Sequence, residues 1–419
     1  MNLFNRVRFA LKAFTESRSL ENPAVSFTEK SIWSELFTIG VSGMTVNQNT
    51  ALNLSAVYAA NKILSEDVAA LPAKVYTRSG KNLSVADNHP VHNLLHFQPN
   101  QLMTPFTFFE TLQTYLDLWG NAYAKIKRDS NNIPVELIII HPDEVKPKIS
   151  STGRLWYNIK GEKTATNESN MLHFVAFLDP GDHYRGLSPI MQAKEVIGNG
   201  LAMQEFSNKF FGSGANMSGI LSTDQTMTPE AVDRLKKSFD LKYSGIDKSH
   251  KTVVLEQGLK YQRIGIEPEA AQFLQSRRFG IEEIARWYRI PPHMLADLER
   301  ATFSNIEHQT MAYVRQTLVP WLVRYEQEFN RKLFSPSERN SFFVKFNVEG
   351  LLRGDSQTRV ENYSKLFNIG AISQNEIREK ENMNPIEGGD KYYVPVNMMD
   401  ANSGGQDNGE GDTDISDGE

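Results

Sequence analysis

Apolar and polar positions in the first half of the chain follow two periods, one helical and one typical of strands. Helical spacing covers three segments, residues 52–70, 90–97 and 105–119. Alternation or short apolar runs cover five predicted strands, residues 74–78, 123–128, 135–140, 154–160 and 171–177. The turn sequence Asp129-Ser130-Asn131-Asn132 separates the second and third strands, which predicts a hairpin. This mixture indicates an α+β domain over residues 50–185.

Long helical segments dominate the second half of the chain. Helical spacing covers residues 190–211, a segment that begins after Thr228, and residues 268–290. Ser188-Pro189 and Thr228-Pro229 each supply an N-cap residue followed by a proline suited to the first helical position. Two strand patterns lie between these helices, at residues 252–255 and 259–264. Pro291-Pro292 ends the last of the three helices abruptly.

Another long helix is predicted over residues 306–333, where apolar residues step by three or four. Pro320 lies inside it and lacks the N–H that would bond the carbonyl of Gln316, so a kink is expected at Pro320. A strand pattern follows at residues 342–348. Ser373-Gln374-Asn375-Glu376 has the residues of a capping box and predicts the start of a short helix.

Length and composition limit the kind of protein. A chain of 419 residues indicates two or three domains. It contains no cysteine, which excludes disulfides, thiolate metal sites and cysteine nucleophiles. No apolar run exceeds five residues, so no membrane-spanning helix is expected.

The two ends of the chain differ from its body. Residues 1–29 are expected to form a flexible arm, which begins with apolar residues at helical spacing beside basic ones. A short amphipathic helix there could dock on a partner or lie on a membrane surface, and the first is favoured. Residues 396–419 are rich in Gly, Asp, Asn and Ser, which predicts a disordered acidic tail.

The charge of the chain is nearly balanced outside its tail. Lys and Arg number 45 against 50 Asp and Glu, a formal net charge of −5. Six of the acids lie in the last nineteen residues, which have no Lys or Arg, so the remainder carries −5 + 6 = +1. This balance argues against a protein that grips DNA tightly without sequence preference, because such binding needs many uncompensated phosphate contacts. It does not argue against a protein through which DNA passes.

Motifs for nucleotide binding and catalysis are missing from the sequence. Gly80-Lys81 lacks the other residues of a Walker loop, and Gly212-Ser213-Gly214 follows a predicted helix instead of a strand. Neither a nucleophile elbow nor a zinc-protease motif is present. The chain is therefore not expected to be an enzyme or to need a cofactor or metal.

Three histidines provide the alternative to that expectation. His89, His92 and His96 have spacings that would align them on one helical face, and three imidazoles can hold zinc. A metal-dependent hydrolase built on them is therefore a competing hypothesis. Pro90 lies within the set, which places His89 outside the helix, and no acidic residue accompanies the three. A surface helix that contains histidines is the favoured interpretation.

Six stretches occur along the chain in a specific order: Tyr184-Arg185-Gly186-Leu187-Ser188-Pro189, Phe210-Phe211-Gly212-Ser213-Gly214-Ala215-Asn216-Met217-Ser218-Gly219, Val254-Leu255-Glu256-Gln257-Gly258-Leu259-Lys260-Tyr261, residues 284–295 (IARWYRIPPHML), Phe303-Ser304-Asn305-Ile306-Glu307, and Asn375-Glu376-Ile377-Arg378 with Pro385 and Gly388-Gly389-Asp390. This ordered set resembles the portal proteins of tailed bacteriophages, in the family typical of long-tailed phages. The resemblance covers residues 30–395. It departs from the family between Leu295 and Phe303, where a glycine-containing loop would be expected.

The resemblance implies a portal-type α+β fold with named regions. These are an α/β wing (residues 30–188), two long stem helices (189–214 and 267–290), a small α/β clip inserted between them (215–266), a tunnel loop (291–305), a long kinked helix with the C-terminal part of the wing (306–349) and a helical crown (350–395).

The resemblance also implies roles for individual residues. Side chains of the tunnel loop would face the DNA channel, namely His293, Met294, Leu295, Asp297, Glu299, Arg300 and Thr302. Basic residues of the stem would be Lys194, Lys209, Arg277, Arg278 and Arg286. Basic residues of the clip would bind the packaging motor or an adaptor, namely Lys236, Lys237, Lys242 and Lys248.

A portal protein of this kind forms a ring of about twelve copies at one vertex of the capsid. By resemblance, double-stranded DNA would enter and leave through the ring. The large terminase subunit, head-completion or adaptor proteins, and the major capsid and scaffold proteins would be its partners. Assembly in the host cytoplasm and residence in the virion are expected, without a membrane. The competing hypotheses are the hydrolase and a scaffold- or membrane-surface-binding protein that acts through the N-terminal helix.

Overall fold

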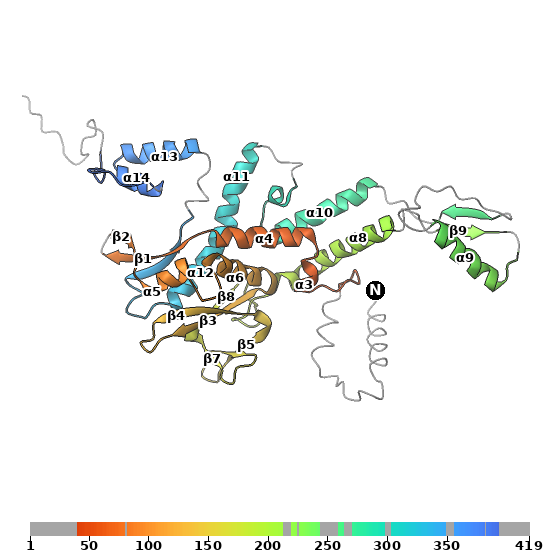
Figure 1. The fold of residues 1–419 in the computed structure, drawn as a ribbon, viewed down its shortest axis with the longest axis horizontal. Coiled ribbons are helices and arrows are strands. Elements are labelled where there is room, and N and C mark those ends of the chain that lie inside the picture. The colour runs from red at the N-terminus through yellow and green to blue at the C-terminus, as the bar shows by residue number, and fades with distance from the viewer. Residues whose placement is uncertain are drawn as a thin grey trace, which may run out of the picture. The chain divides into compact units, whose positions relative to one another are not determined.

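The computed structural model describes residues 40–79, 82–212, 219–223, 226–243, 259–263, 270–297, 303–348, 356–381 and 383–393. The chain divides into two compact units, residues 1–348 and 349–419. The described part of the first unit holds the sheets and the long helices, and that of the second holds two short helices (Figure 1). This combination of elements confirms the α+β class.

The larger core of the first unit is built on an antiparallel sheet with the strand order β4-β3-β8, made of β3 (Asn121–Arg128), β4 (Pro134–Ile140) and β8 (Met171–Val175). The predicted hairpin is present as the pair β3–β4, with Tyr123 opposite Ile140. Helix α6 (Pro105–Trp119) packs against β3, and its Phe109 contacts the rings of Tyr325, Phe329 and Phe346 edge to face. Aromatic packing of this kind adds to the free energy of apolar burial.

A second antiparallel sheet has the order β11-β1-β2 and consists of β1 (Ala73–Ser79), β2 (Asn82–Val85) and β11 (Phe342–Phe346). Helix α12 (Val319–Lys332) satisfies the free edge of this sheet with two side chains. Glu326 accepts a hydrogen bond from the backbone N–H of Phe346 at 2.9 Å, and Asn330 accepts one from Val344 at 2.7 Å. An edge paired in this way is closed to the addition of another strand.

The same helix closes the free edge of β8 in the first sheet. Glu328 accepts from the backbone N–H of His173 at 3.0 Å, and Lys332 donates to the carbonyl of Met171. Glu328 and Lys332 are buried and lie 2.8 Å apart as an ion pair, so each charge has a partner. Helix α12 therefore connects the two sheets. Glu326 and Asn330 on one side contact the second sheet, and Glu328 and Lys332 on another side contact the first.

A third, smaller sheet has the order β5-β6-β7, made of β5 (Val145–Ile149), β6 (Leu155–Ile159) and β7 (Thr166–Asn167). Two 3₁₀ turns flank it, η2 (Pro142–Glu144) and η3 (Glu168–Asn170). Tyr157 of this sheet packs on Tyr123 and Met171 of the first sheet, so the two share a small core. Pro147 lies on the edge strand β5, where its missing N–H removes no bond within the sheet interior.

The helices of the first half surround these sheets. They are α3 (Gln48–Ala51), α4 (Ser55–Ala69), α5 (Pro90–His92) with the following π-helical turn η1 (Asn93–Phe97), and α6. Helix α4 packs on α6 (Figure 1). Segment 186–188 passes against the end of α6 at Gly120, whose left-handed backbone (φ 75°) ends that helix.

Two long helices extend from this body. The helix predicted over 190–211 is divided at Ala193 into α7 (Pro189–Gln192) and α8 (Lys194–Gly212). Ser188 caps α7 as predicted, because its hydroxyl accepts from the N–H of Met191. Helix α10 (Ala270–Tyr288) packs along α8 and against α4 (Figure 1). None of the helices in the described segments is both long and apolar enough to cross a membrane.

Between these two helices the chain forms a short antiparallel pair, β9 (Gly219–Ser222) with β10 (Lys260–Arg263), and helix α9 (Pro229–Tyr243). Thr228 caps α9 as predicted, since its hydroxyl accepts from the N–H of Ala231 at 3.4 Å. The strand predicted at 252–255 lies outside the described residues.

The described part of the second unit comprises α13 (Ser356–Asn368), α14 (Gln374–Lys380) and residues 383–393. The predicted capping box is confirmed, because Ser373 and Glu376 each accept a hydrogen bond from the other's backbone N–H. The Asn375 amide bonds both the N–H and the carbonyl of Ile386. A Cβ on Gly389 would lie 2.5 Å from Asn375 Oδ1, so a larger residue would displace the amide that bonds Ile386.

Candidate functional site

The segment that leaves α10 is the most distinctive local structure in the first unit. Helix α10 ends in a Schellman motif, in which the N–H of Ile290 bonds the carbonyl of Ala285 at 2.9 Å. The left-handed residue of this motif is Arg289 (φ 57°), where glycine is usual. Thr317 on the next helical segment donates to the Arg289 carbonyl at 2.6 Å. The end of α10 is thereby fixed before Pro291 and Pro292 turn the chain away.

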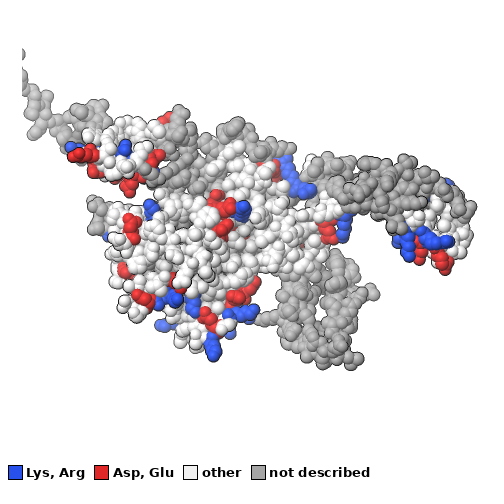
Figure 2. Space-filling model, viewed as in Figure 1, with Lys and Arg blue, Asp and Glu red and all other residues white. Residues whose placement is uncertain are grey.

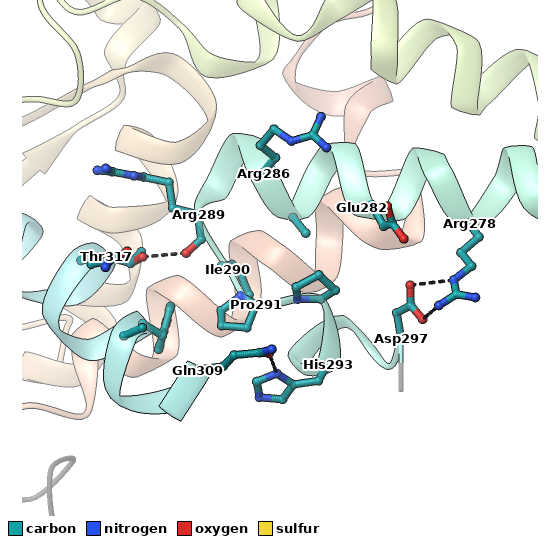
Figure 3. A pocket seen from close by; sticks show the side chains of 15 residues that line it. Arg278, Glu282, Arg286, Arg289, Ile290, Pro291, His293, Asp297, Gln309 and Thr317 are labelled. Carbon is teal, nitrogen blue, oxygen red and sulfur yellow. Dashed lines mark hydrogen bonds and ion pairs between the residues drawn. The ribbon is translucent and has the colours of Figure 1, made fainter. Parts of the chain in front are cut away.

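The residues after the two prolines fold back on α10. Pro292–Leu295 form a 3₁₀ turn, η5, which ends at Ala296 with a left-handed backbone (φ 64°). Asp297 then receives two parallel hydrogen bonds from the guanidinium of Arg278, at 3.0 and 2.9 Å (Figure 3). Such a bidentate pair fixes direction as well as distance. It joins a predicted loop residue to a predicted stem residue.

A pocket of about 640 Å³ opens beside this pair, between α10, η5 and the helical segment that begins at Phe303 (Figure 3). Glu282, Arg286 and Arg289 line it from the side of α10. On the opposite side the His293 ring contacts Gln309 at 2.8 Å. The lining combines charged and amide side chains with apolar ones such as Ile290 and Pro291, a mixture that suits contacts with a macromolecule.

The helical segment across the pocket continues without interruption in three parts. It begins with α11 (Phe303–Tyr313), widens into the π-helical turn η6 (Val314–Leu318) and continues as α12. Pro320 is the second residue of α12 and cannot bond the Gln316 carbonyl, which lies in the π turn. The irregular turn is thus adjacent to the predicted kink position.

A buried polar network below the pocket was not found from the sequence. Asp117 in α6 accepts from the Gln113 amide at 2.8 Å, and Gln113 in turn accepts from the Tyr325 hydroxyl. The Tyr288 hydroxyl at the end of α10 donates to the backbone carbonyl of Asp117. Burial raises the pKa of Asp117 well above its usual range, and the hydrogen bond from Gln113 opposes this rise in part. The network ties the end of α10 to α6 and α12.

The other predicted loop residues divide into two groups. Met294 and Leu295 lie in η5 and are partly buried, whereas Glu299, Arg300 and Thr302 lie outside the described residues. No described residue besides Asp297 therefore carries a carboxylate in the predicted loop. In the described part of the loop the Asp297 carboxylate is paired with the Arg278 guanidinium.

The predicted basic residues lie on separate elements. Lys194 begins α8, Lys209 near its end pairs with Glu205, and Arg277 and Arg286 are exposed on α10. Lys236 and Lys237 are exposed on α9. The side chain of Lys242, on α9, and the whole of Lys248 lie outside what the structure describes.

The three histidines do not converge on a common point. His89 is the N-cap of α5, as its position before Pro90 predicts, and its ring lies against Phe334 and Phe342. His92 is buried and accepts from the N–H of Val75 through Nδ1. Of the three imidazole rings, only those of His92 and His96 lie next to each other, with their centroids 5.0 Å apart. Among the described residues no group of three or more His, Asp or Glu is placed to hold a metal ion.

Comparisons with known proteins identify a family for the chain. The family model described as phage portal protein matches residues 55–382. The chain is 31% identical to a probable portal protein of Streptomyces phage phiC31, over 90% of this chain and 87% of the relative. It is 30% identical to the portal protein of Enterobacteria phage HK97, over 87% of this chain and 88% of the relative.

A solved structure gives the same fold at lower identity. The neck of a native GTA particle, computed with C12 symmetry, contains a chain that matches with a TM-score of 0.54 and 22% identity. The match covers 81% of this chain and 92% of the other. The fold, the ordered motifs and the two relatives lead to one conclusion: this chain belongs to the phage portal protein family.

Proposed function

We propose that this protein forms a ring at one vertex of a phage capsid, through which double-stranded DNA is packaged and ejected. The observation that carries the proposal is the family match over residues 55–382, since it includes α8, α10 and the segment folded back between α10 and α11. The C12 symmetry used for the solved neck supports a ring of about twelve copies. Capsid and scaffold proteins are expected to surround the ring.

The channel is proposed to include the end of α10 and residues 291–305. Arg286 and Arg289 line a pocket there, Glu282 offsets one of their two charges, and the Arg278–Asp297 pair adds no net charge. Balanced charge suits a conduit, because each uncompensated phosphate contact would slow DNA that must slide. The protein is proposed to act as a passage and not as a catalyst, with the packaging motor supplying the energy.

Helix α9 is proposed as a docking site for the large terminase subunit and, later, for a head-completion or adaptor protein. Lys236 and Lys237 are both exposed, and neither has an ion-pair partner among the described side chains. Figure 2 shows Lys and Arg gathered over this helix beside a smaller acidic group. Charged, exposed side chains are typical of transient interfaces, where they steer association.

Electron microscopy of the purified chain, with light scattering for mass, tests the ring. Rings with a central opening wide enough for a DNA duplex, at a mass near that of twelve chains, are the expected result. The same preparation is then mixed with scaffold protein. A chain that stays monomeric or forms a closed dimer both alone and with scaffold contradicts the proposal.

A further inference from the structure

One side of α10 presents two large apolar side chains that the described part of the chain leaves about half exposed. Phe279 is 55% exposed and Trp287 is 45% exposed, and Glu283 lies between them at four-residue spacing on the same face. On the neighbouring helix α8, Phe206 is 51% exposed. An aqueous channel crossed by DNA would leave such side chains in water, whereas a protein partner would bury them.

A groove of about 590 Å³ lies beside these residues, between the start of α4, α8 and α10. Its apolar lining includes Leu54, Val196, Met203 and Phe279. Arg277 and Glu283 also line the groove, so charges of both signs accompany the apolar centre. Protein interfaces have this composition, and a DNA-binding surface would instead show an excess of basic residues.

Two glycines of the groove differ in what surrounds them. A Cβ on Gly200 of α8 would meet the Leu54 side chain at 2.9 Å, so contacts within the chain account for this glycine. A Cβ on Gly280 of α10 would meet nothing within 4 Å. Glycine inside a helix is less stable than alanine, and no neighbour within the described chain requires it at position 280. Close approach of another backbone would require it.

We infer that the face of α10 around Phe279 and Gly280, with the groove beside it, is the contact surface for a neighbouring copy of this chain. This inference rests on the proposed ring and names a surface that holds it together. A closed ring of identical subunits buries one surface of each copy against a different surface of the next, so every copy must carry an uncovered face of this kind. The inference also removes Phe279 and Gly280 from the channel wall.

Cysteine labelling tests the inference directly, because the natural chain has no cysteine. Phe279→Cys is compared with Ser151→Cys, which lies in an exposed turn between β5 and β6. Both are treated with a small maleimide as assembled rings and followed by intact-mass spectrometry. Labelling at position 279 is expected to be about tenfold slower or more than at position 151. Similar rates in rings would overturn the inference and leave the ring itself standing.

Substitution of Gly280 provides the second readout. Gly280→Ala should leave the melting temperature of the dissociated chain unchanged or raise it, because the position is open and alanine favours helix. Gly280→Leu should reduce the yield of rings by about tenfold or more, since its side chain would occupy the space of the neighbour. The matched control, Ser151→Leu, should form rings normally. Normal rings from Gly280→Leu would contradict the inference, and no rings from the natural chain, alone or with scaffold, would contradict the proposed function as well.

Discussion

At the scale of single residues, two glycines explain why one of the ordered motifs has its sequence. A Cβ on Gly186 would lie 2.1 Å from the Gly120 carbonyl, and one on Gly120 would lie 2.0 Å from the Leu187 carbonyl. The Asn121 amide bonds both the N–H and the carbonyl of Gly186. The backbones after α6 and before α7 can therefore touch only where both residues are glycine. Positions so far apart in the chain give no local signal of this contact.

His173 is a second residue whose state depends on its surroundings. Its Nε2 donates to the Asn121 carbonyl oxygen, which already accepts from Gly186, and its Nδ1 accepts from the Tyr157 hydroxyl. Both nitrogens are thus satisfied in the neutral form of the ring. Burial, with smaller contributions from Lys332 and Arg331, lowers the pKa of His173 to about 3.

This lowered pKa predicts how stability changes with pH. Below the ordinary value of 6.5 the unfolded chain binds a proton at this position, and the folded chain does not until about pH 3. His173 therefore lowers the free energy of unfolding by about 2 kcal/mol between pH 7 and pH 5. Urea unfolding of His173→Gln should show a correspondingly smaller loss over this range. His308→Gln, on the exposed surface of α11, should keep the full loss, and identical slopes for both variants would refute the assignment.

At the scale of elements, the sequence predicted helix starts well and sheet edges not at all. Ser188, Thr228 and Ser373 each cap a helix as expected, because capping depends on residues within one turn. The closure of two sheet edges by α12 could not be predicted, since it needs Glu326 to meet a strand about twenty residues away in the chain and Glu328 to meet one much further. The π turn before Pro320 was missed as well.

The candidate site shows the same limit. Pro291-Pro292 correctly indicated the end of α10, yet the left-handed Arg289 gave no signal, because glycine is the usual marker of that position. The family resemblance implied separate roles for Arg278, in the stem, and Asp297, in the tunnel loop. Their pairing depends on the turn at Ala296, which directs the chain back along α10. Local sequence patterns do not encode such a return.

The ion pair between Arg278 of α10 and Asp297, just after η5, leads to a prediction about the proposed channel. Arg278→Gln or Asp297→Asn should each reduce the DNA packaged per particle, because either change releases the residues after η5 from α10. The exchange Arg278→Asp with Asp297→Arg should recover part of the loss, because it restores an ion pair between the two positions. Packaged DNA is measured by nuclease protection. No recovery in the exchanged variant would mean that the Asp297 charge acts on DNA directly and not through Arg278.

At the scale of the whole molecule, charge is dispersed where DNA is proposed to pass and concentrated where partners are proposed to dock. The body outside the acidic tail carries only +1 of net charge, and Figure 2 shows both signs interspersed over the first unit. Helix α9 is a local exception, with two adjacent exposed lysines. Long-range attraction from such a patch acts mainly on the association rate and falls as salt is added.

Reversal of this patch should therefore weaken docking without affecting the ring. Lys236→Glu with Lys237→Glu is expected to raise the Kd for the large terminase subunit or the adaptor by about tenfold at low salt, and by less at high salt. Lys146→Glu with Lys148→Glu, on the edge strand β5, makes the same charge change on another exposed surface and should leave both affinities unchanged. Surface-plasmon resonance on assembled rings measures each partner in turn. Equal weakening by both variants would indicate a general charge effect, whereas unchanged binding by the α9 variant would place the docking contact elsewhere. A loss that is confined to the α9 variant, is seen for both partners and becomes smaller at high salt would support α9 as a shared surface that terminase and adaptor occupy one after the other.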